Sequence, residues 1–147
     1  MKTLRRVVIG ILVALVLIQF VPVSRTNPPV ESEIQTPQDV ESILSRSCYD
    51  CHSNKTVWPW YSYVAPVSWL VSSDVSGGRQ KLNFTTWNRY TPDQQMKRLR
   101  DIWKEVQGGD MPLWYYLIKH SGARLSDEDK TVLRDWTQSA AQPGPGK

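Results

Sequence analysis

The chain lacks most of the features by which an enzyme or a disulfide-rich protein is identified. Its 147 residues include only two cysteines and two histidines. The sequence shows no nucleophile–base set, no catalytic carboxylate pair and no phosphate-binding loop. It has no internal repeat and no low-complexity tract in its central part. A chain of this length builds one hydrophobic core, which excludes a multi-domain enzyme, a long repeat array and a polytopic transporter.

Acidic residues are missing from residues 1–23, which hold Lys2, Arg5 and Arg6 ahead of an apolar run from Val7 to Val23. In the rest of the chain, 15 basic residues face 14 acidic ones. The sequence pI of about 9.2 is therefore mainly an N-terminal effect and does not predict a nucleic-acid-binding surface. As a helix, the run would rise about 26 Å, slightly less than a hydrocarbon core of about 30 Å.

Small residues are absent from the positions that would precede a signal-peptide cut near residue 23. No cysteine follows at which a lipid would be attached. We therefore favour an uncleaved signal anchor over a cleaved signal peptide. Because basic residues keep the N-terminus in the cytoplasm, we expect a single-pass protein of the bacterial inner membrane. Everything after Val23 is then expected on the periplasmic side.

Signals for strands are scarce, since the chain has no Asn-Gly or Asp-Gly hairpin turn and no clean alternation of useful length. Helix starts are frequent, and they predict an all-α fold. We expect a signal anchor at 1–23, a tether at 24–35, one helical domain at 36–141 and a disordered tail at 142–147.

Three helix starts combine a capping residue with a proline or an acid in the first turn. They are Thr36-Pro37, Thr91-Pro92 and Ser126-Asp127. The second helix is expected to stop at Gly108-Gly109. Shorter helices are predicted at 66–73 and 113–119.

The first predicted helix ends in Cys48-Tyr49-Asp50-Cys51-His52, a C-x-x-C-H motif typical of c-type haem attachment. Haem has two adjacent vinyl groups, and each forms a thioether with one thiol. Two cysteines three residues apart on a helix project from one face. The motif therefore predicts one haem c, attached through Cys48 and Cys51, with His52 as the proximal axial ligand of the iron.

Three other uses of the two cysteines are weighed against haem. In an oxidising compartment, the two cysteines could form a redox dithiol or a structural disulfide. A thioredoxin-like redox protein, however, needs βαβ units, which the sequence does not predict. Cys48, Cys51, His52 and His120 also make a Cys2His2 zinc set. Adjacent Cys51 and His52 fit one tetrahedral ion poorly, so we favour haem.

A low-spin haem iron takes a second axial ligand. Met111 lies beyond a predicted helix stop and is followed by Pro112. Such an irregular, stiffened segment is suited to presenting a thioether, so Met111 is the predicted distal ligand. Met96 falls in an apolar helical stripe and is interpreted as core. His120 is the alternative distal ligand, and an open sixth position is the third option.

Aromatic residues gather after the motif and after Met111. The two clusters are Trp58, Trp60, Tyr61 and Tyr63, and Trp114, Tyr115 and Tyr116. Either they line the porphyrin edges or they are ordinary core packing. Arg79 is a candidate partner for a haem propionate, with a solvated loop position as its alternative.

Further motifs accompany C-x-x-C-H across the exported part of the chain. They are Ser53-Asn54, Thr56, Trp58–Ser62, Ala65–Trp69, Asp74-Val75, Leu82–Phe84, Gly109–Pro112, Leu125–Asp129 and Trp136. With them, the chain resembles the bacterial haem-binding domain family of small exported monohaem proteins, over roughly residues 40–138. The resemblance implies a cytochrome-c-like all-α fold. It places the haem cysteines and proximal histidine on Cys48, Cys51 and His52, a Met-Pro element on Met111, and a later histidine on His120.

The function that these features predict is a membrane-tethered monohaem c-type cytochrome that transfers single electrons. Its expected partners are redox proteins at the membrane and the haem-attachment machinery, with no nucleic acid. The alternative is a haem-based sensor or small-ligand-binding module with an open or exchangeable sixth position. No enzyme activity is expected. A peroxidase is a minor option, because only His120 is left for acid–base help.

Overall fold

The structure, a computed structural model, describes residues 1–141. The tail predicted at 142–147 lies outside the described residues. Within them the chain is mostly helical and has no strand, and one isolated bridge pairs Ser32 with Thr86. The prediction of an all-α fold is confirmed.

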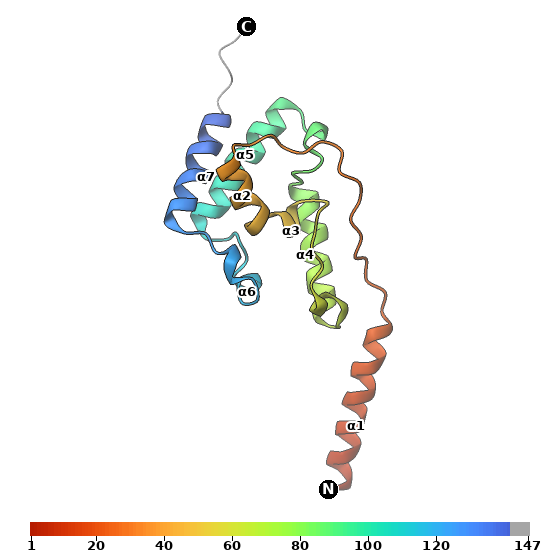
Figure 1. The fold of residues 1–147 in the computed structure, drawn as a ribbon. Helices are drawn as coiled ribbons and strands as arrows, with labels where there is room; N and C mark the ends of the chain where they lie inside the picture. The colour runs from red at the N-terminus through yellow and green to blue at the C-terminus, as the bar shows by residue number, and fades with distance from the viewer. Residues whose placement is uncertain (142–147) are drawn as a thin grey trace.

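The described α-helices are α1 (Lys2–Leu17), α2 (Gln38–Ser47), α3 (Tyr49–His52), α4 (Val67–Lys81), α5 (Pro92–Gly108), α6 (Trp114–Leu117) and α7 (Asp127–Ala140). Short 3-10 helices lie between some of them: η1 (Ile18–Phe20), η2 (Trp60–Tyr63), η3 (Trp87–Arg89) and η4 (Ser121–Ala123). Helix α1 projects away from a domain that all the other helices form (Figure 1).

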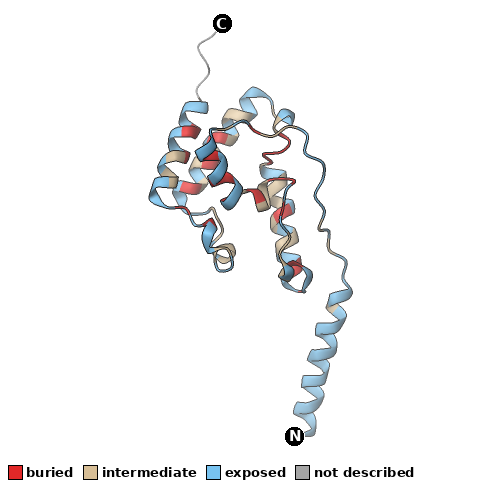
Figure 2. Cartoon of the chain, viewed as in Figure 1, coloured by how far each residue is buried: buried red, intermediate tan, exposed pale blue. Residues whose placement is uncertain are grey.

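The core lies between α2, α5 and α7. Its most buried members include Leu44, Phe84, Leu99 and Leu133, and Figure 2 shows the buried positions on the inward faces of these helices. Helix α3 continues from α2 and packs against α4, which also contacts η2. The single turn of α3 therefore joins the three-helix core to the α4 side of the domain.

Local sequence signals account for the helix ends. Thr91 and Ser126 each form a capping box with the residue three positions later, and Gly109 ends α5 with a φ of 79°. Only glycine adopts this left-handed conformation readily. Helix α2 also forms where the start at Thr36-Pro37 predicted a helix, although it begins at Gln38 with Pro37 as its cap.

Two predicted boundaries were wrong. The helix predicted at 66–73 continues to Lys81, through Gly77 and Gly78. A Cβ at Gly78 would lie 2.6 Å from the carbonyl oxygen of Cys51, so a glycine in mid-helix lets α4 approach α3 closely. In addition, α2 ends before the motif, because Cys48 has a φ of −129° and starts the separate turn α3.

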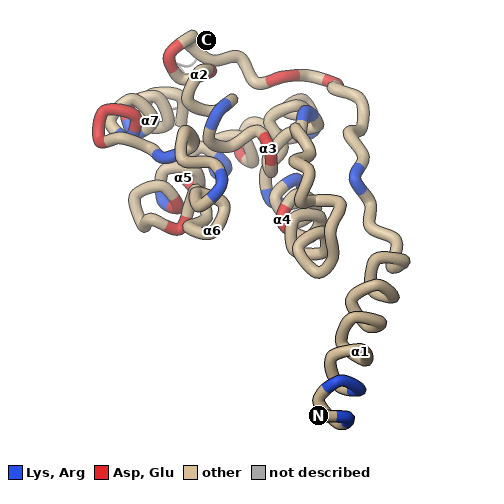
Figure 3. Tube along the Cα trace, turned by 60° about the horizontal axis from the view of Figure 1, so that its bottom comes forward, with Lys and Arg blue, Asp and Glu red and all other residues tan. Residues whose placement is uncertain are grey.

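Residues Lys2–Phe20 form one helical segment of 19 residues with a mean hydropathy of 2.0 and no buried residue. Its length and composition suit either a membrane anchor or a signal sequence. Basic residues lie at its N-terminal end (Figure 3). At its other end, the Gln19 side chain donates to the carbonyl of Ala65 (3.2 Å) and accepts from the amide of Ala65 (2.9 Å).

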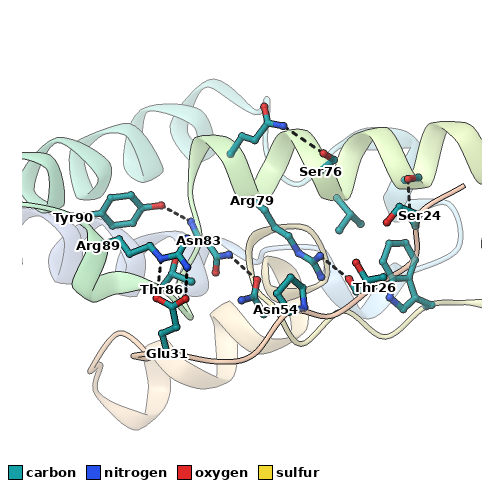
Figure 4. Close-up of a pocket in the computed structure, with 15 residues that line it drawn as sticks. Ser24, Thr26, Glu31, Asn54, Ser76, Arg79, Asn83, Thr86, Arg89 and Tyr90 are labelled. Carbon is teal, nitrogen blue, oxygen red and sulfur yellow. Dashed lines mark hydrogen bonds and ion pairs between the residues drawn. The ribbon is translucent and has the colours of Figure 1, made fainter.

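Residues 24–35, the connecting segment, lie extended along the domain. The amides of Glu31 and Ile34 donate to the carbonyls of Thr85 and Phe84, and the Asn54 side chain donates to the carbonyl of Pro29. Side chains add further contacts (Figure 4). The segment expected as a tether is thus bonded to the domain along most of its length.

Candidate functional site

The C-x-x-C-H motif occupies the single turn α3. The amides of Cys51 and His52 both donate to the carbonyl of Cys48, at 3.2 and 2.9 Å. Both cysteines are free and partly exposed. The turn is fixed at its far end, where the amide of Phe84 donates to the carbonyl of His52 (2.8 Å). The two thiols and the imidazole therefore come from one short, well-anchored turn.

His52 is oriented by backbone oxygens. Its Nδ1 lies 3.1 Å from the carbonyl oxygens of both Gly78 and Leu82. Carbonyl oxygens only accept, so Nδ1 carries the proton and the lone pair lies on Nε2. Burial lowers the pKa of His52, which favours the neutral ring. A neutral imidazole whose other nitrogen is hydrogen-bonded is the usual form of a metal-ligating histidine.

The two thiols are not activated. Burial, the main cause, raises the pKa of Cys48 and of Cys51 to about 12, and the charges of Asp74 and Asp50 add to the effect at Cys51. Redox-active cysteines instead have lowered pKa values. The environment therefore disfavours the redox dithiol.

A cavity of about 250 Å³, the Met111 cavity, brings four of the expected site residues together. Cys48, Cys51 and His52 line it from α3, and Met111 lines it from the loop after α5. The amide of Met111 donates to the carbonyl of Glu105 (3.2 Å), which holds this loop against the end of α5. A thioether and an imidazole thus border the same space.

A second space, the α5 cavity, measures about 450 Å³ and is also lined by Cys48, His52 and Met111. Its walls include apolar Leu82, Phe84, Ile102 and Val106, and its basic residues are Lys81, Lys97, Arg98 and Lys104. Ser47 Oγ and Arg98 Nε, from two residues that line it, are buried without a hydrogen-bond partner among the described residues. Apolar walls, basic side chains and unpaired polar atoms beside the motif fit a flat apolar group that carries carboxylates.

His120 lies elsewhere. Its Nε2 is 2.5 Å from the hydroxyl of Tyr61, and its ring stacks on Tyr116 at 4.1 Å. It lines a largely apolar space of about 380 Å³, the His120 cavity, which borders Cys51 but neither His52 nor Met111. The described residues also contain no cluster of three His, Cys, Asp or Glu side chains that would hold a metal ion. The zinc set is therefore not assembled.

Comparison with known families agrees with this site. The family model described as a haem-binding domain matches residues 13–139, which cover the connecting segment and nearly all of the described domain. The chain belongs to the haem-binding domain family. No curated protein and no solved structure matches it.

Two tyrosines of the haem-binding domain attach α6 to the motif side. The hydroxyl of Tyr116 donates to Asp50 Oδ2 (2.8 Å), and that of Tyr115 donates to Asp74 Oδ2 (3.1 Å). Burial and the neighbouring carboxylates raise the pKa of both tyrosines, so they stay neutral donors. Because α6 begins three residues after Met111, these bonds also position the Met111 loop.

The aromatic clusters divide in the folded haem-binding domain. Tyr115 and Tyr116 line the Met111 cavity, whereas Trp60 and Trp114 are about three-quarters exposed. Trp58 donates to Asn27 of the connecting segment. The cavities that Cys51 lines are bordered by four of the seven aromatic residues, Trp60, Tyr61, Tyr115 and Tyr116. Met96 is half-buried, rather than fully in the core.

Arg79 lines neither the Met111 cavity nor the α5 cavity. The alternative of a solvated loop position was wrong. Arg79 lies in α4, where it donates to the carbonyls of Ser53 (2.7 Å) and Thr26 (2.8 Å) and to the side chains of Asn27 and Thr56. Figure 4 shows it in a separate space of about 560 Å³ beside the connecting segment. The basic residues that line the cavities beside the motif are Lys81, Lys97, Arg98 and Lys104, and no local pattern distinguishes them in the sequence.

Proposed function

We propose that this haem-binding domain belongs to a membrane-tethered c-type cytochrome, which holds one haem covalently through Cys48 and Cys51 and transfers single electrons. One observation carries the proposal: His52, with Nε2 free, lines the same two cavities as the thioether of Met111. Two thiols lie on the same turn as this imidazole, at the spacing that matches the two vinyl groups of haem.

The roles of the residues follow from their surroundings. When bound, haem supplies a one-electron iron couple. His52, fixed in orientation by the carbonyls of Gly78 and Leu82, would bind the iron. Met111 would supply the second protein ligand, and its thioether would stabilise ferrous iron and raise the potential. Because Met111 borders both cavities, the electron carrier is favoured over a sensor with an open sixth position.

Other residues of the chain exclude water and balance charge. Tyr115 and Tyr116 cover one side of the Met111 cavity, which keeps the ligand loop closed against the motif. Lys81 and Arg98 line the α5 cavity, where their charges would pair with carboxylates of the bound group. Lowering water access in this way strengthens each of these polar contacts.

For the cellular location, we infer that α1 anchors the protein in the bacterial inner membrane, with the haem domain on the periplasmic side. Basic residues before an apolar helix favour this orientation. The electron donors and acceptors are then redox proteins at the same membrane surface, and the haem-attachment machinery acts on the exported chain. A covalent bond keeps the cofactor where a dissociable one would be lost.

The test uses the full-length protein, exported in a bacterium with a haem-attachment system. After separation on a denaturing gel, haem staining should remain with the wild-type chain and disappear from the Cys48→Ser/Cys51→Ser double variant. Met96→Ala, away from the motif cavities, should keep the stain. The protein should stay in membranes at its full-length mass after a high-salt wash, and its spectrum should titrate reversibly with one electron.

Undiminished staining of the double variant would disprove covalent attachment through the motif. A soluble product beginning near Ser24 would show that the N-terminal helix is a cleaved signal. A haem that cannot be cycled between ferrous and ferric forms would exclude the electron-carrier role.

A further inference from the structure

One face of the domain carries no charge. The 18 residues at 56–73 contain no Asp, Glu, Lys, Arg or His, and neither do residues 111–118. Large side chains from both stretches are 43–75 % exposed: Trp60, Tyr63, Val64, Val67, Trp114 and Ile118. We call these six residues the apolar face. The two groups flank the His120 cavity, which residues of both stretches line. Exposed apolar side chains gathered in this way mark protein or membrane contacts.

The apolar face lies at the end of the domain from which α1 departs. In Figure 1, α6 and the N-terminal end of α4 both lie on the side toward α1, and these elements with η2 carry the face. The link is specific, because Gln19, in the last turn of the apolar helical segment, pairs with both backbone groups of Ala65. Val64 and η2 are thereby held where the apolar helix ends.

The composition of the face matches the boundary between lipid and water. Trp and Tyr are enriched at this depth of a bilayer, and nearby Arg and Lys extend toward the lipid headgroups. Arg25 donates to the carbonyl of Ser62 (3.2 Å), and its guanidinium lies 4.5 Å from the ring centroid of Tyr63. Lys119 directly follows Ile118. One basic side chain thus contacts an aromatic residue of the apolar face, and a second basic residue follows the face in the chain.

We infer that the apolar face seats the haem domain directly on the phospholipid bilayer, with Trp60, Tyr63 and Val64 among the headgroups. This inference rests on the proposed membrane anchoring by α1. The domain then contacts the membrane at two places, the anchor helix and its own surface. It sits in one fixed orientation, with α3 and its motif at a constant height above the lipid.

The experiment places a polarity-sensitive nitrobenzoxadiazole probe on single new cysteines of the full-length holoprotein. Val64→Cys reports the apolar face. Asn88→Cys is the matched control, because Asn88 is exposed in η3. Helix α5 begins three residues after η3, and the N-terminal end of α5 lies on the side of the domain away from α1 (Figure 1). Both proteins are reconstituted in vesicles of phosphatidylcholine and phosphatidylglycerol. Flotation of the vesicles is measured first, and quenching by aqueous iodide or by a nitroxide on the lipid headgroup is measured next.

Both variants should float with the vesicles. The probe at position 64 should emit at shorter wavelength, be quenched by the headgroup nitroxide, and be several-fold less accessible to iodide than the probe at position 88. Adding Trp60→Ser and Tyr63→Ser should restore iodide access at position 64, while flotation and the haem spectrum stay unchanged.

Equal iodide access at both positions in floating vesicles would overturn the seating of the face and leave the anchor intact. A protein that does not float would overturn the anchor and the seating together. Protection at position 64 in vesicles without quenching by the headgroup nitroxide would also overturn the inference, since protein and not lipid would then cover the face.

Discussion

The two sides of α3 offer different candidate ligands for iron. Met111 and His120 are nine residues apart in the chain, and each lines a cavity that borders Cys51. His120, however, is engaged by the hydroxyl of Tyr61 and stacked on Tyr116, whereas Met111 shares its cavity with His52. The comparison shows that the other partners of a side chain, and not its chemistry alone, decide whether it is available to a metal.

The largest effect is expected when the ligand of the Met111 side is removed. Met111→Ala should abolish the weak charge-transfer band of iron–methionine ligation and lower the reduction potential. Water or hydroxide would replace the lost thioether, and such oxygen ligands favour ferric iron. Covalent haem should remain, since Cys48 and Cys51 are untouched. Visible spectra and a potentiometric titration measure both effects.

The matched variant in the His120 cavity is His120→Ala, which should leave the iron–methionine band in place. Met96→Ala, on the half-buried side of α5, should leave it in place as well and cost only stability. If His120→Ala converted a low-spin spectrum to high-spin while Met111→Ala did not, the pair of axial ligands would be two histidines.

A smaller effect, on stability, is expected at the contact between α3 and α4. This contact supports both the Met111 cavity and the His120 cavity. Gly78→Ala should lower the free energy of unfolding by about 1–3 kcal/mol, since the new Cβ meets backbone atoms of Cys51. Gly77→Ala is the matched control. Nothing lies within 4 Å of a Cβ there, so it should be neutral or stabilising by up to about 1 kcal/mol. Denaturant unfolding of the holoproteins compares them, and equal stabilities would contradict a close helix contact.

The smallest expected effect on stability comes from removing a single tyrosine hydroxyl, and it distinguishes Tyr116 from Tyr61. Tyr116→Phe removes the hydrogen bond to Asp50, and Tyr61→Phe removes the one to His120, so each should cost about 1 kcal/mol of stability. Only Tyr116→Phe should also make the iron–methionine band disappear at a lower temperature, because α6 continues the Met111 loop. A temperature series of spectra tests this. An equal shift in both variants would mean that α6 does not position the ligand loop.

The sequence was most informative where structure is decided locally. The helix starts at Thr91 and Ser126 depend on residues close together in the chain, and the C-x-x-C-H motif depends on five consecutive ones. Each was found without knowledge of the fold. His52 and Met111 line the same cavities, while their roles as iron ligands stay predictions.

The features that escaped prediction depend on distant contacts. Gly78 resembles a helix breaker until α3 is known to cross α4 at that point. Arg79 follows two glycines and suggested a loop, but its four partners come from segments that only the fold brings together. The connecting segment has few apolar residues, and its attachment uses mainly backbone amides, which composition does not reveal.

The attachment of residues 24–35 to the domain sets how an anchored protein searches for its partners. A free linker of this length would let a domain wander by about 20 Å, taking about 5–6 Å times the square root of the residue number. Bonded to Phe84, Thr85 and Arg79, the segment has no such slack. If α1 anchors the protein as proposed, encounters depend on lateral diffusion and rotation of the whole molecule in the membrane plane. Crowding and lipid viscosity, rather than linker length, set their frequency.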